Sequence, residues 1–273
     1  MTIKCNAHTH TTYCDGKNSG EEMILAAIDK GFTCLGFSGH CYTPFDQSYC
    51  MSPGGTGRYR REIRALQEKY SGVIDILLGT EWDYFGEVDR EEYDFTIGSV
   101  HYIKSALTDQ YYSVDNTPEE LERCLEEGFH GNVMAMLQSY YDSVADMAVS
   151  GKPDILGHFD LIRKLNREGR FFDESSPAYL HIVKGAVEKA VAAGAVFEIN
   201  TGGVYRGYRS SPYPSDFVLR RVLELGGRII LSSDAHDTQG IDFLFPEMEA
   251  KIKEMGFKEA QILAKEGIRP QKL

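Results

Sequence analysis

Six of the eight histidines stand at or just past the end of a predicted β-strand, and together they follow five different strands. Two carboxylates occupy equivalent places, one at the end of a further strand and one beside the last of these histidines. Imidazole and carboxylate groups are the usual protein ligands of divalent metal ions. The sequence therefore predicts a metal site built from His8, His10, His40, Glu81, His101, His158, Asp234 and His236.

The spacing in His8-Thr9-His10 supports this interpretation. Side chains two residues apart in an extended segment point to the same side, so both imidazoles can reach one ion. With Asp15 the set has nine candidates, which is more than one tetrahedral ion needs. Glu81 has two carboxylate oxygens and can bridge neighbouring ions. We therefore expect two to three divalent ions, and Zn, Fe and Mn all suit imidazole and carboxylate ligands.

Clustered metal ions generate hydroxide at neutral pH and stabilise developing negative charge, which suits the hydrolysis of a phosphate ester. Packing is the simpler explanation for any one of these residues, since a lone His158 could be a hydrogen-bonded core histidine. Packing does not readily explain the whole set at strand ends. Cys14 and Cys41 could be soft ligands near the site, although small buried residues are the simpler interpretation.

Candidate anion-binding residues follow the predicted strand at residues 196–200. Gly202-Gly203 can bring backbone N–H groups close to a ligand. Arg206 and Arg209 are candidate phosphate contacts, because a guanidinium group offers bidentate hydrogen bonds. Arg163 is either a contact of the same kind or the start of a solvated helix.

Asp160 lies two residues after His158 and is a candidate general acid for the leaving alkoxide. The alternative is a helix N-cap or a partner that orients a metal ligand. Tyr42, Tyr102 and Tyr205 are candidate walls for the organic part of a substrate, although each is more often explained by packing.

Strands and helices that alternate along the chain must position these residues. This alternation predicts a parallel α/β sheet, and runs such as Ile76-Leu77-Leu78 have the continuous apolar character of buried parallel strands. In a closed α/β barrel the carboxyl ends of all strands meet at one mouth, where barrel enzymes carry their sites. We expect seven strands, at residues 3–7, 34–38, 74–79, 95–100, 154–157, 196–200 and 228–231.

Start signals place several helices between these strands. Ser19 and Glu22 form a predicted capping box, and Thr117 with Pro118 predicts a second helix start. We expect a long loop through Pro53-Gly54-Gly55 before a charged helix over residues 58–70. Further helices are expected over residues 132–149, 178–193 and 214–226, and a last helix and tail over residues 257–273.

The charged residues argue against one class of function. The 273 residues carry 29 Lys and Arg against 41 Asp and Glu, a net charge of −12, which argues against general nucleic-acid binding. Arg58, Arg60, Arg61 and Arg64 form the one basic cluster, which is typical of the solvated face of a helix.

The six cysteines contain no CxxC pair and indicate reduced thiols of a cytoplasmic protein. No run of 18 apolar residues is present, so we expect no membrane partner.

A set of short motifs resembles the PHP (polymerase and histidinol phosphatase) family over about 230 residues, in order and in spacing. No single motif carries the resemblance. Gly157-His158-Phe159-Asp160 and Glu198-Ile199-Asn200-Thr201 are similar to the histidinol-phosphatase branch. The remaining motifs are His8-Thr9-His10, Asp15-Gly16, Gly39-His40, Gly79-Thr80-Glu81, Ser99-Val100-His101 and Ser233-Asp234-Ala235-His236.

The resemblance implies a distorted (β/α)7 TIM-like barrel, a single domain over residues 1–273, with a trinuclear metal centre. It also implies a phosphoric monoester hydrolase that converts L-histidinol phosphate and water to L-histidinol and phosphate in histidine biosynthesis. Attack would come from a metal-bridging hydroxide, with Asp160 or a metal-bound water as the proton donor. The expected partners are this small phosphomonoester and inorganic phosphate, and a homodimer is left open.

The resemblance also distributes the residues among three ions. His8, His10, Glu81 and Asp234 would hold the first ion, while Glu81, His101 and His158 would hold the second. Asp15, His40 and His236 would hold the third, and Arg163 and Arg206 would contact the phosphate. Two departures concern the third ion: Gly39 stands where the family often has Asp, and Asp15 where some relatives have His.

Three other functions stay open at this point. The first is a PHP phosphatase for another ester, such as a phosphotyrosine, a nucleotide or a sugar phosphate. The second is a PHP-type exonuclease, against which the net charge of −12 argues. The third is a non-catalytic metal-binding protein that retains the barrel.

Overall fold

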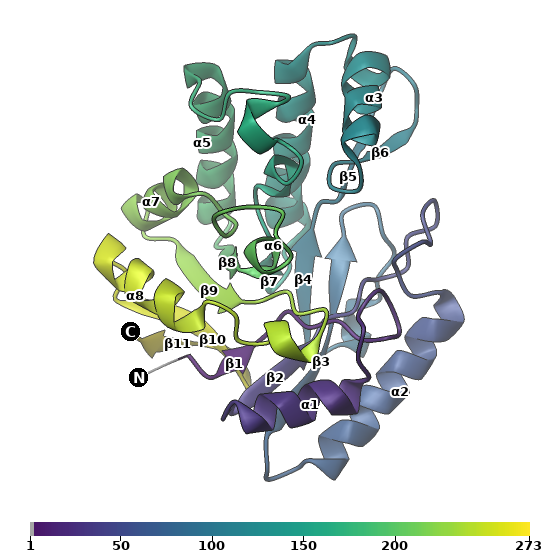
Figure 1. Ribbon diagram of the computed structural model, residues 1–273, viewed down its shortest axis with the longest axis vertical. Coiled ribbons are helices and arrows are strands. Elements are labelled where there is room, and N and C mark those ends of the chain that lie inside the picture. Colours follow the sequence, from purple (N-terminus) through teal and green to yellow (C-terminus); the bar gives the residue numbers. More distant parts are fainter. Residues whose placement is uncertain (1–2) are drawn as a thin grey trace.

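A curled sheet of nine strands forms the centre of the protein, with helices around its outer side (Figure 1). The computed structural model describes residues 3–273. The first eight strands of the sheet run parallel to their neighbours and the last is antiparallel. Their order is β1 (Cys5–Asn6), β2 (Cys34–Phe37), β3 (Asp75–Asp83), β4 (Phe95–Ser99), β7 (Ile155–Leu156), β8 (Val196–Asn200), β9 (Arg228–Ser232), β10 (Glu259–Ala264) and β11 (Gly267–Lys272).

The ends of the first and last expected strands meet at the mouth of this curled sheet. Thr9, after β1, pairs with Ala235, after β9, in a parallel bridge. The His10 N–H donates to the Ala235 carbonyl at 2.8 Å, and the Ala235 N–H donates to the His8 carbonyl at 3.0 Å. The fold is therefore the expected distorted TIM-like barrel, closed by hydrogen bonds between segments that carry candidate metal ligands.

The expected helix starts are confirmed. The Ser19 hydroxyl accepts from the Glu22 N–H and the Glu22 carboxylate accepts from the Ser19 N–H, which completes the capping box. Thr117 caps the helix that Pro118 begins. The helices are α1 (Gly20–Asp29), α2 (Pro53–Lys69), α3 (Pro118–Phe129), α4 (Val133–Asp146), α5 (Pro177–Ala192), α6 (Gly202–Tyr205), α7 (Asp216–Glu224) and α8 (Phe245–Met255).

The prediction of a loop through Pro53-Gly54-Gly55 is wrong, because these residues form the first turn of α2. Ser52 is the N-cap and its hydroxyl accepts from the Gly55 N–H at 3.1 Å, while Pro53 occupies the first turn. A capping residue followed by proline is a strong start signal that outweighs two glycines.

The helix expected within residues 257–273 is also wrong. This segment forms β10 and β11, an antiparallel pair, and β10 lies parallel to β9. Pairing with the sheet edge overrides local preference there, so the sheet has nine strands instead of seven. A separate hairpin of β5 (Tyr102–Lys104) and β6 (Tyr111–Ser113) follows His101 and was not expected.

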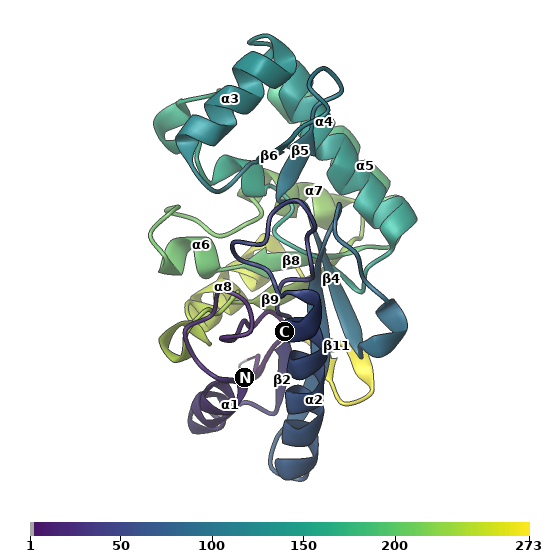
Figure 2. The ribbon, with the colours of Figure 1, turned by 90° about the vertical axis from the view of Figure 1, so that its right-hand side faces the viewer.

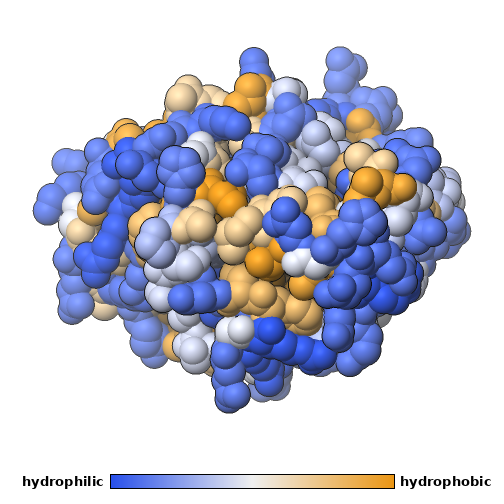
Figure 3. Space-filling model, turned by 90° about the horizontal axis from the view of Figure 1, so that it is seen from above, coloured by the Kyte–Doolittle hydropathy of each residue, from blue (hydrophilic) through white to orange (hydrophobic). Residues whose placement is uncertain are grey.

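Helices α1 to α5 lie toward the two ends of the molecule (Figure 1). In two perpendicular views, α1 and α2 lie at one end and α3 to α5 with the β5–β6 hairpin at the other (Figures 1 and 2). Seen from the α3 to α5 end, hydrophilic side chains dominate the surface around a smaller central group of hydrophobic ones (Figure 3). Within residues 3–273, no helix has the length and apolar character needed to cross a membrane.

Two other expectations from composition can be compared with the structure. All six cysteines are free thiols. In the basic cluster on α2, Arg60 pairs with Glu92 at 3.1 Å and Arg64 with Asp94 at 2.7 Å. Surface ion pairs of this kind are what the solvated helix face predicts.

Phe95 fills the barrel interior, and the glycines around it leave it room. A Cβ atom at Gly79 would lie 2.4 Å from the Phe95 ring, and one at Gly36 would lie 2.7 Å from it. Both contacts are far shorter than van der Waals distance, so the neighbouring strands β2 and β3 can lie this close to the ring only with glycine at these positions.

We therefore expect Gly79→Ala to lower the free energy of unfolding by about 1–3 kcal/mol through overpacking. Urea denaturation of the metal-free protein in a chelator measures this without a contribution from ligand binding. Gly185→Ala in α5 is the matched control, because a Cβ there meets nothing within 4 Å. It should raise the stability by about 0.5–1 kcal/mol, and equal effects of both substitutions would contradict the packing argument.

Candidate metal centre and phosphate pocket

Glu81 is the centre of the candidate site. It lies within β3, is 1% exposed, and pairs through its backbone with His40. Five imidazole nitrogens lie within 3.6 Å of its two carboxylate oxygens. The distances are 3.2 Å for His8, 3.6 Å for His10, 2.9 Å for His40, 3.4 Å for His101 and 2.8 Å for His158. A carboxylate surrounded in this way can serve more than one ion.

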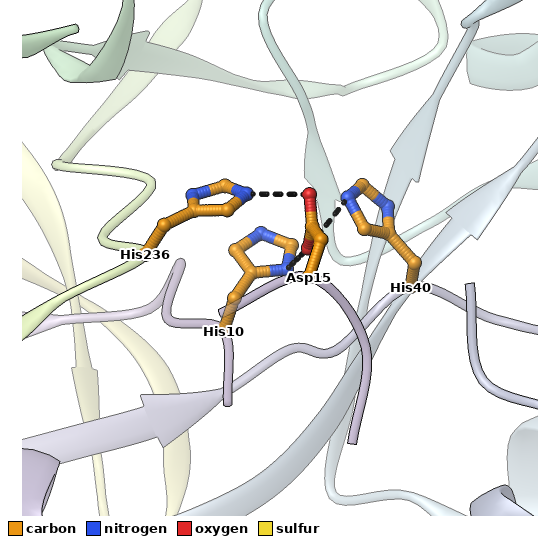
Figure 4. A group of neighbouring side chains, drawn as sticks. All are labelled: His10, Asp15, His40 and His236. Atoms are coloured by element: carbon orange, nitrogen blue, oxygen red, sulfur yellow. Dashed lines mark hydrogen bonds and ion pairs between the residues drawn. The ribbon is translucent and has the colours of Figure 1, made fainter. Parts of the chain in front are cut away.

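Asp15 gathers a second group at the outer side of the site (Figure 4). Its carboxylate lies 3.0 Å from His236 Nε2, 3.6 Å from His10 Nδ1 and 3.6 Å from His40 Nε2. His10 and His40 also face Glu81, so the two groups share side chains. Although burial opposes it, the neighbouring His40 and His236 hold the pKa of Asp15 well below its usual value.

Asp234 joins the two groups from the end of β9. Its Oδ1 lies 3.2 Å from His10 Nε2, 3.4 Å from His236 Nδ1 and 3.6 Å from His8 Nε2. The backbone at Asp234 has φ 51°, a left-handed conformation uncommon outside glycine. Such backbone strain concentrates at functional sites, where it aims a side chain.

The buried atoms of the site fit metal ions. His8 Nε2, His10 Nε2, Glu81 Oε2 and His158 Nδ1 have no hydrogen-bond partner within residues 3–273. An unsatisfied buried polar atom costs about 1–3 kcal/mol, and a coordinated cation would remove that cost. Ligand atoms within 4.8 Å of one another form three overlapping groups: His10, Asp15, His40 and His236; His8, His10 and Glu81; and His40, Glu81 and His101.

All nine residues predicted from the sequence as metal ligands therefore lie together. The first group contains all three residues expected to hold the third ion, Asp15, His40 and His236. The second group contains three of the four residues expected to hold the first ion, His8, His10 and Glu81. In the remaining group His40 stands where His158 was expected, although His158 also contacts Glu81. The assignment of ligands to particular ions stays a prediction.

The protonation state of the His10 imidazole favours metal binding. Burial and the neighbouring imidazoles of His236 and His40 lower the pKa of His10 to about 3, so its ring is neutral at pH 7. Neutral imidazole is the form that binds metal. Cys14 lies 3.5 Å from His10, but burial raises the pKa of its thiol and disfavours the thiolate that metals bind.

Two buried carboxylates that the sequence analysis missed hold the candidate ligands in place. Glu198 accepts from His8 Nδ1 at 2.6 Å, from the His158 N–H at 2.7 Å and from the Ser232 hydroxyl at 2.6 Å. Asp83 lies 3.2 Å from His101 Nδ1 and accepts from the His101 N–H at 3.0 Å. For Asp83 a signal existed, because it lies two residues after Glu81 on one strand and shares its face.

Arg206 lies where a phosphate contact was expected. Its guanidinium donates to Asp234 Oδ2 at 2.8 Å, lies 2.9 Å from His236 Nδ1, and lines a cavity of about 760 Å³ beside the metal centre. Gly203 lines the same cavity. Of the predicted tyrosine walls, Tyr102 and Tyr205 line it and Tyr42 does not.

Asp160 and Arg163 do not line this cavity, and the roles predicted for them stay predictions. They pair with each other at 2.9 Å, and Arg163 also donates to Glu174 at 2.7 Å. Asp160 further accepts from the Ser215 N–H at 2.8 Å. Arg209 joins Glu174 at 3.2 Å and likewise lies outside the cavity.

Comparison with known proteins agrees with this geometry. A family model described as "PHP domain" matches residues 6–202. The chain belongs to the PHP family. Its relatives include a "Probable histidinol-phosphatase" of Deinococcus radiodurans, 30% identical over 269 residues that cover 94% of this chain and 95% of that protein. A protein of the same name in Schizosaccharomyces pombe is 26% identical over 257 residues, 86% of this chain and 81% of that protein.

A solved structure also shares the fold. The histidinol phosphate phosphatase of Lactococcus lactis, complexed with zinc, L-histidinol and phosphate, superposes with a TM-score of 0.70. The alignment covers 98% of this PHP protein and 99% of that chain, at 21% sequence identity. The distorted barrel is therefore the fold of a known phosphatase of this family.

Removing the negative charge of Glu198 should weaken metal binding. Glu198→Gln keeps the size of the side chain but no longer fixes His8 as a carboxylate does, and we expect a loss of about 10–100-fold in metal affinity. Chelator competition monitored by elemental analysis measures this directly. Glu188→Gln, an exposed carboxylate on α5 paired with Arg221, is the control and should bind metal normally. Equal affinity in both variants would show that Glu198 does not position the ligands.

Proposed function

We propose that this protein is a metal-dependent phosphomonoesterase that converts L-histidinol phosphate to L-histidinol and phosphate in histidine biosynthesis. The observation that carries the proposal is a cluster of nine candidate ligands, seven of them buried, beside a cavity that Arg206 lines. Four of its buried imidazole and carboxylate atoms have no hydrogen-bond partner within residues 3–273. The relatives named histidinol-phosphatase supply the substrate. We place the reaction in the cytoplasm and in one domain over residues 1–273.

The metal centre would hold two to three ions of Zn, Fe or Mn, bound by His8, His10, Asp15, His40, Glu81, His101, His158, Asp234 and His236. Bound ions would lower the pKa of water at the site and neutralise charge on the phosphate. Glu198 orients His8 and Asp83 orients His101. The imidazole rings of these two histidines therefore stay directed at Glu81.

The protein itself contributes binding and orientation of the phosphate. Arg206 carries donors on the cavity surface and is held by Asp234, so its guanidinium is already oriented when a phosphate oxygen arrives. Gly202 and Gly203 keep the backbone of α6 close to the same place, since a Cβ at Gly202 would lie 3.0 Å from Arg206. Asp160 is already bound to Arg163 and is not assigned the proton of the leaving oxygen.

The deciding experiment measures phosphate release from L-histidinol phosphate, beside a phosphotyrosine, a nucleotide and a sugar phosphate, and nucleotide release from single-stranded DNA. Metal content is determined on the same sample. We expect two to three metals per chain, turnover of L-histidinol phosphate above the other esters, and loss of activity in a chelator that added metal restores. Full metal occupancy without turnover of any ester would refute the phosphatase.

Arg206→Lys should lower kcat/KM for the phosphomonoester about 10–100-fold, because an ammonium group cannot reproduce the bidentate geometry. Elemental analysis should show unchanged metal content, which separates phosphate binding from damage to the metal centre. Arg209→Lys is the matched control outside the cavity and should stay within about threefold of the wild type, because lysine keeps the charge that pairs with Glu174 and the side chain does not reach the cavity. Equal losses in the two variants would contradict a specific role for Arg206.

A further inference from the structure

The two sides of the cavity differ in the groups that they offer a ligand. The side next to Asp234 and His236 carries the Arg206 guanidinium. On the Arg206 side, Lys17 and Asp237 also line the cavity and pair with each other at 3.0 Å. The other side adjoins His101 and His158 and is formed by the segment after His40, by the residues that follow β6, and by the loop after β7. The lining residues there are Asp46, Ser48, Tyr49, Tyr102, Ser113, Asp115, Asn116, Leu161 and Lys164.

Asp46 and Asp115 are the two carboxylates of this second side. The Tyr102 hydroxyl donates to Asp46 Oδ2 at 2.7 Å, and the Ser48 N–H donates to Asp46 Oδ1 at 3.0 Å. Asp115 Oδ1 accepts from the Ser113 hydroxyl at 3.1 Å, and Asp115 Oδ2 accepts from Lys164 Nζ at 2.8 Å. An ionised carboxylate has about four acceptor sites, so both groups can accept further hydrogen bonds from a ligand.

Both carboxylates line the same cavity as His101 and His158. Although burial opposes ionisation of both groups, Lys164, His101 and His158 lower the pKa of Asp115 to about 2. Hydrogen bonds from Ser48 and Tyr102 likewise lower the pKa of Asp46. Among the lining residues of this side, Lys164 is the one cation, and it faces Asp115 and the ring of Tyr208 at 4.5 Å. Two carboxylates against one ammonium leave a negative charge beside the metal centre.

Aromatic rings complete this side of the cavity. The rings of Tyr49 and Tyr102 lie 6.4 Å apart at 34°, and Tyr49 meets His40 edge to face at 4.7 Å. Faces of tyrosine rings attract cations and accommodate flat rings. Carboxylates and aromatic walls together form a surface suited to a positively charged organic group.

We propose that Asp46 and Asp115 select phosphomonoesters whose organic part is a cation. The ester would place its phosphate beside Arg206 and the metal centre, and its positive charge beside the two carboxylates. The ammonium group and the imidazole ring of L-histidinol phosphate have this character. The inference rests on the proposed phosphatase activity but concerns the organic part of the substrate, which that proposal leaves unassigned.

The test compares O-phosphoethanolamine with n-propyl phosphate. The first ester carries an ammonium group where the second carries a methyl group of similar size. L-histidinol phosphate is measured beside them, all with the metal-loaded protein. The readout is the ratio of kcat/KM for each cationic ester to kcat/KM for the propyl ester. Comparing this ratio between wild type and variants cancels the difference between the leaving groups.

Asp46→Asn and Asp115→Asn should each lower this ratio about 10–100-fold, mainly through KM, because each removes one charged hydrogen bond to the cation. Asp109→Asn is the matched control. Asp109 lies in the turn between β5 and β6, its side chain is 88% exposed, and its φ of 55° is one that asparagine tolerates. It makes the same change in net charge outside the cavity and should keep the wild-type ratio.

The possible outcomes separate this inference from the proposed function. A wild-type enzyme that cleaves L-histidinol phosphate, with variants that keep its ratio or with Asp109→Asn equally affected, would overturn the inference and leave the function standing. A wild-type enzyme that prefers O-phosphoethanolamine but does not cleave L-histidinol phosphate would refute the proposed function, and loss of that preference in the two variants would still support the inference. No preference for either cationic ester in the wild type would overturn it.

Discussion

Burial of Glu81 among five imidazoles is the constraint on which the rest of the structure depends. An isolated buried carboxylate is costly, and this one is held as an anion because the neighbouring His40, His8 and His101 lower its pKa well below the usual value against the effect of burial. Those imidazoles arrive from separate strands. The barrel must therefore be closed accurately at its mouth before the centre can exist.

The closure and the centre are built by the same residues. His8 and His10 supply both candidate ligands and the backbone groups that pair with Ala235 across the seam. Glu198 connects three strands, because it binds the ring of His8, the backbone of His158 and the hydroxyl of Ser232. A buried polar network with several satisfied members fixes one arrangement of its parts, since any displacement leaves a charged group without a partner.

The cavity beside this network is where we propose that the substrate binds. It is lined by Arg206, which we propose binds the phosphate, and by Asp46 and Asp115, which we propose bind a cation. The loops that form the second side lie after His40 and after β6, outside the barrel itself. In the proposed function the barrel would thus supply the phosphate chemistry, and these loops would decide which organic group is accepted.

The sequence by itself determined the alternation of strands and helices, the start of α1 at Ser19, and the gathering of the nine candidate ligands. These follow from local rules, since a strand end, a capping box and the spacing of His8 and His10 are each written in a few neighbouring residues. Only the tertiary structure decided that Glu198 supports the ligands, that β10 joins the sheet, and that Asp160 accepts from the Ser215 N–H. Each of these depends on a partner from another element, and one residue's type does not reveal which long-range partner it will meet.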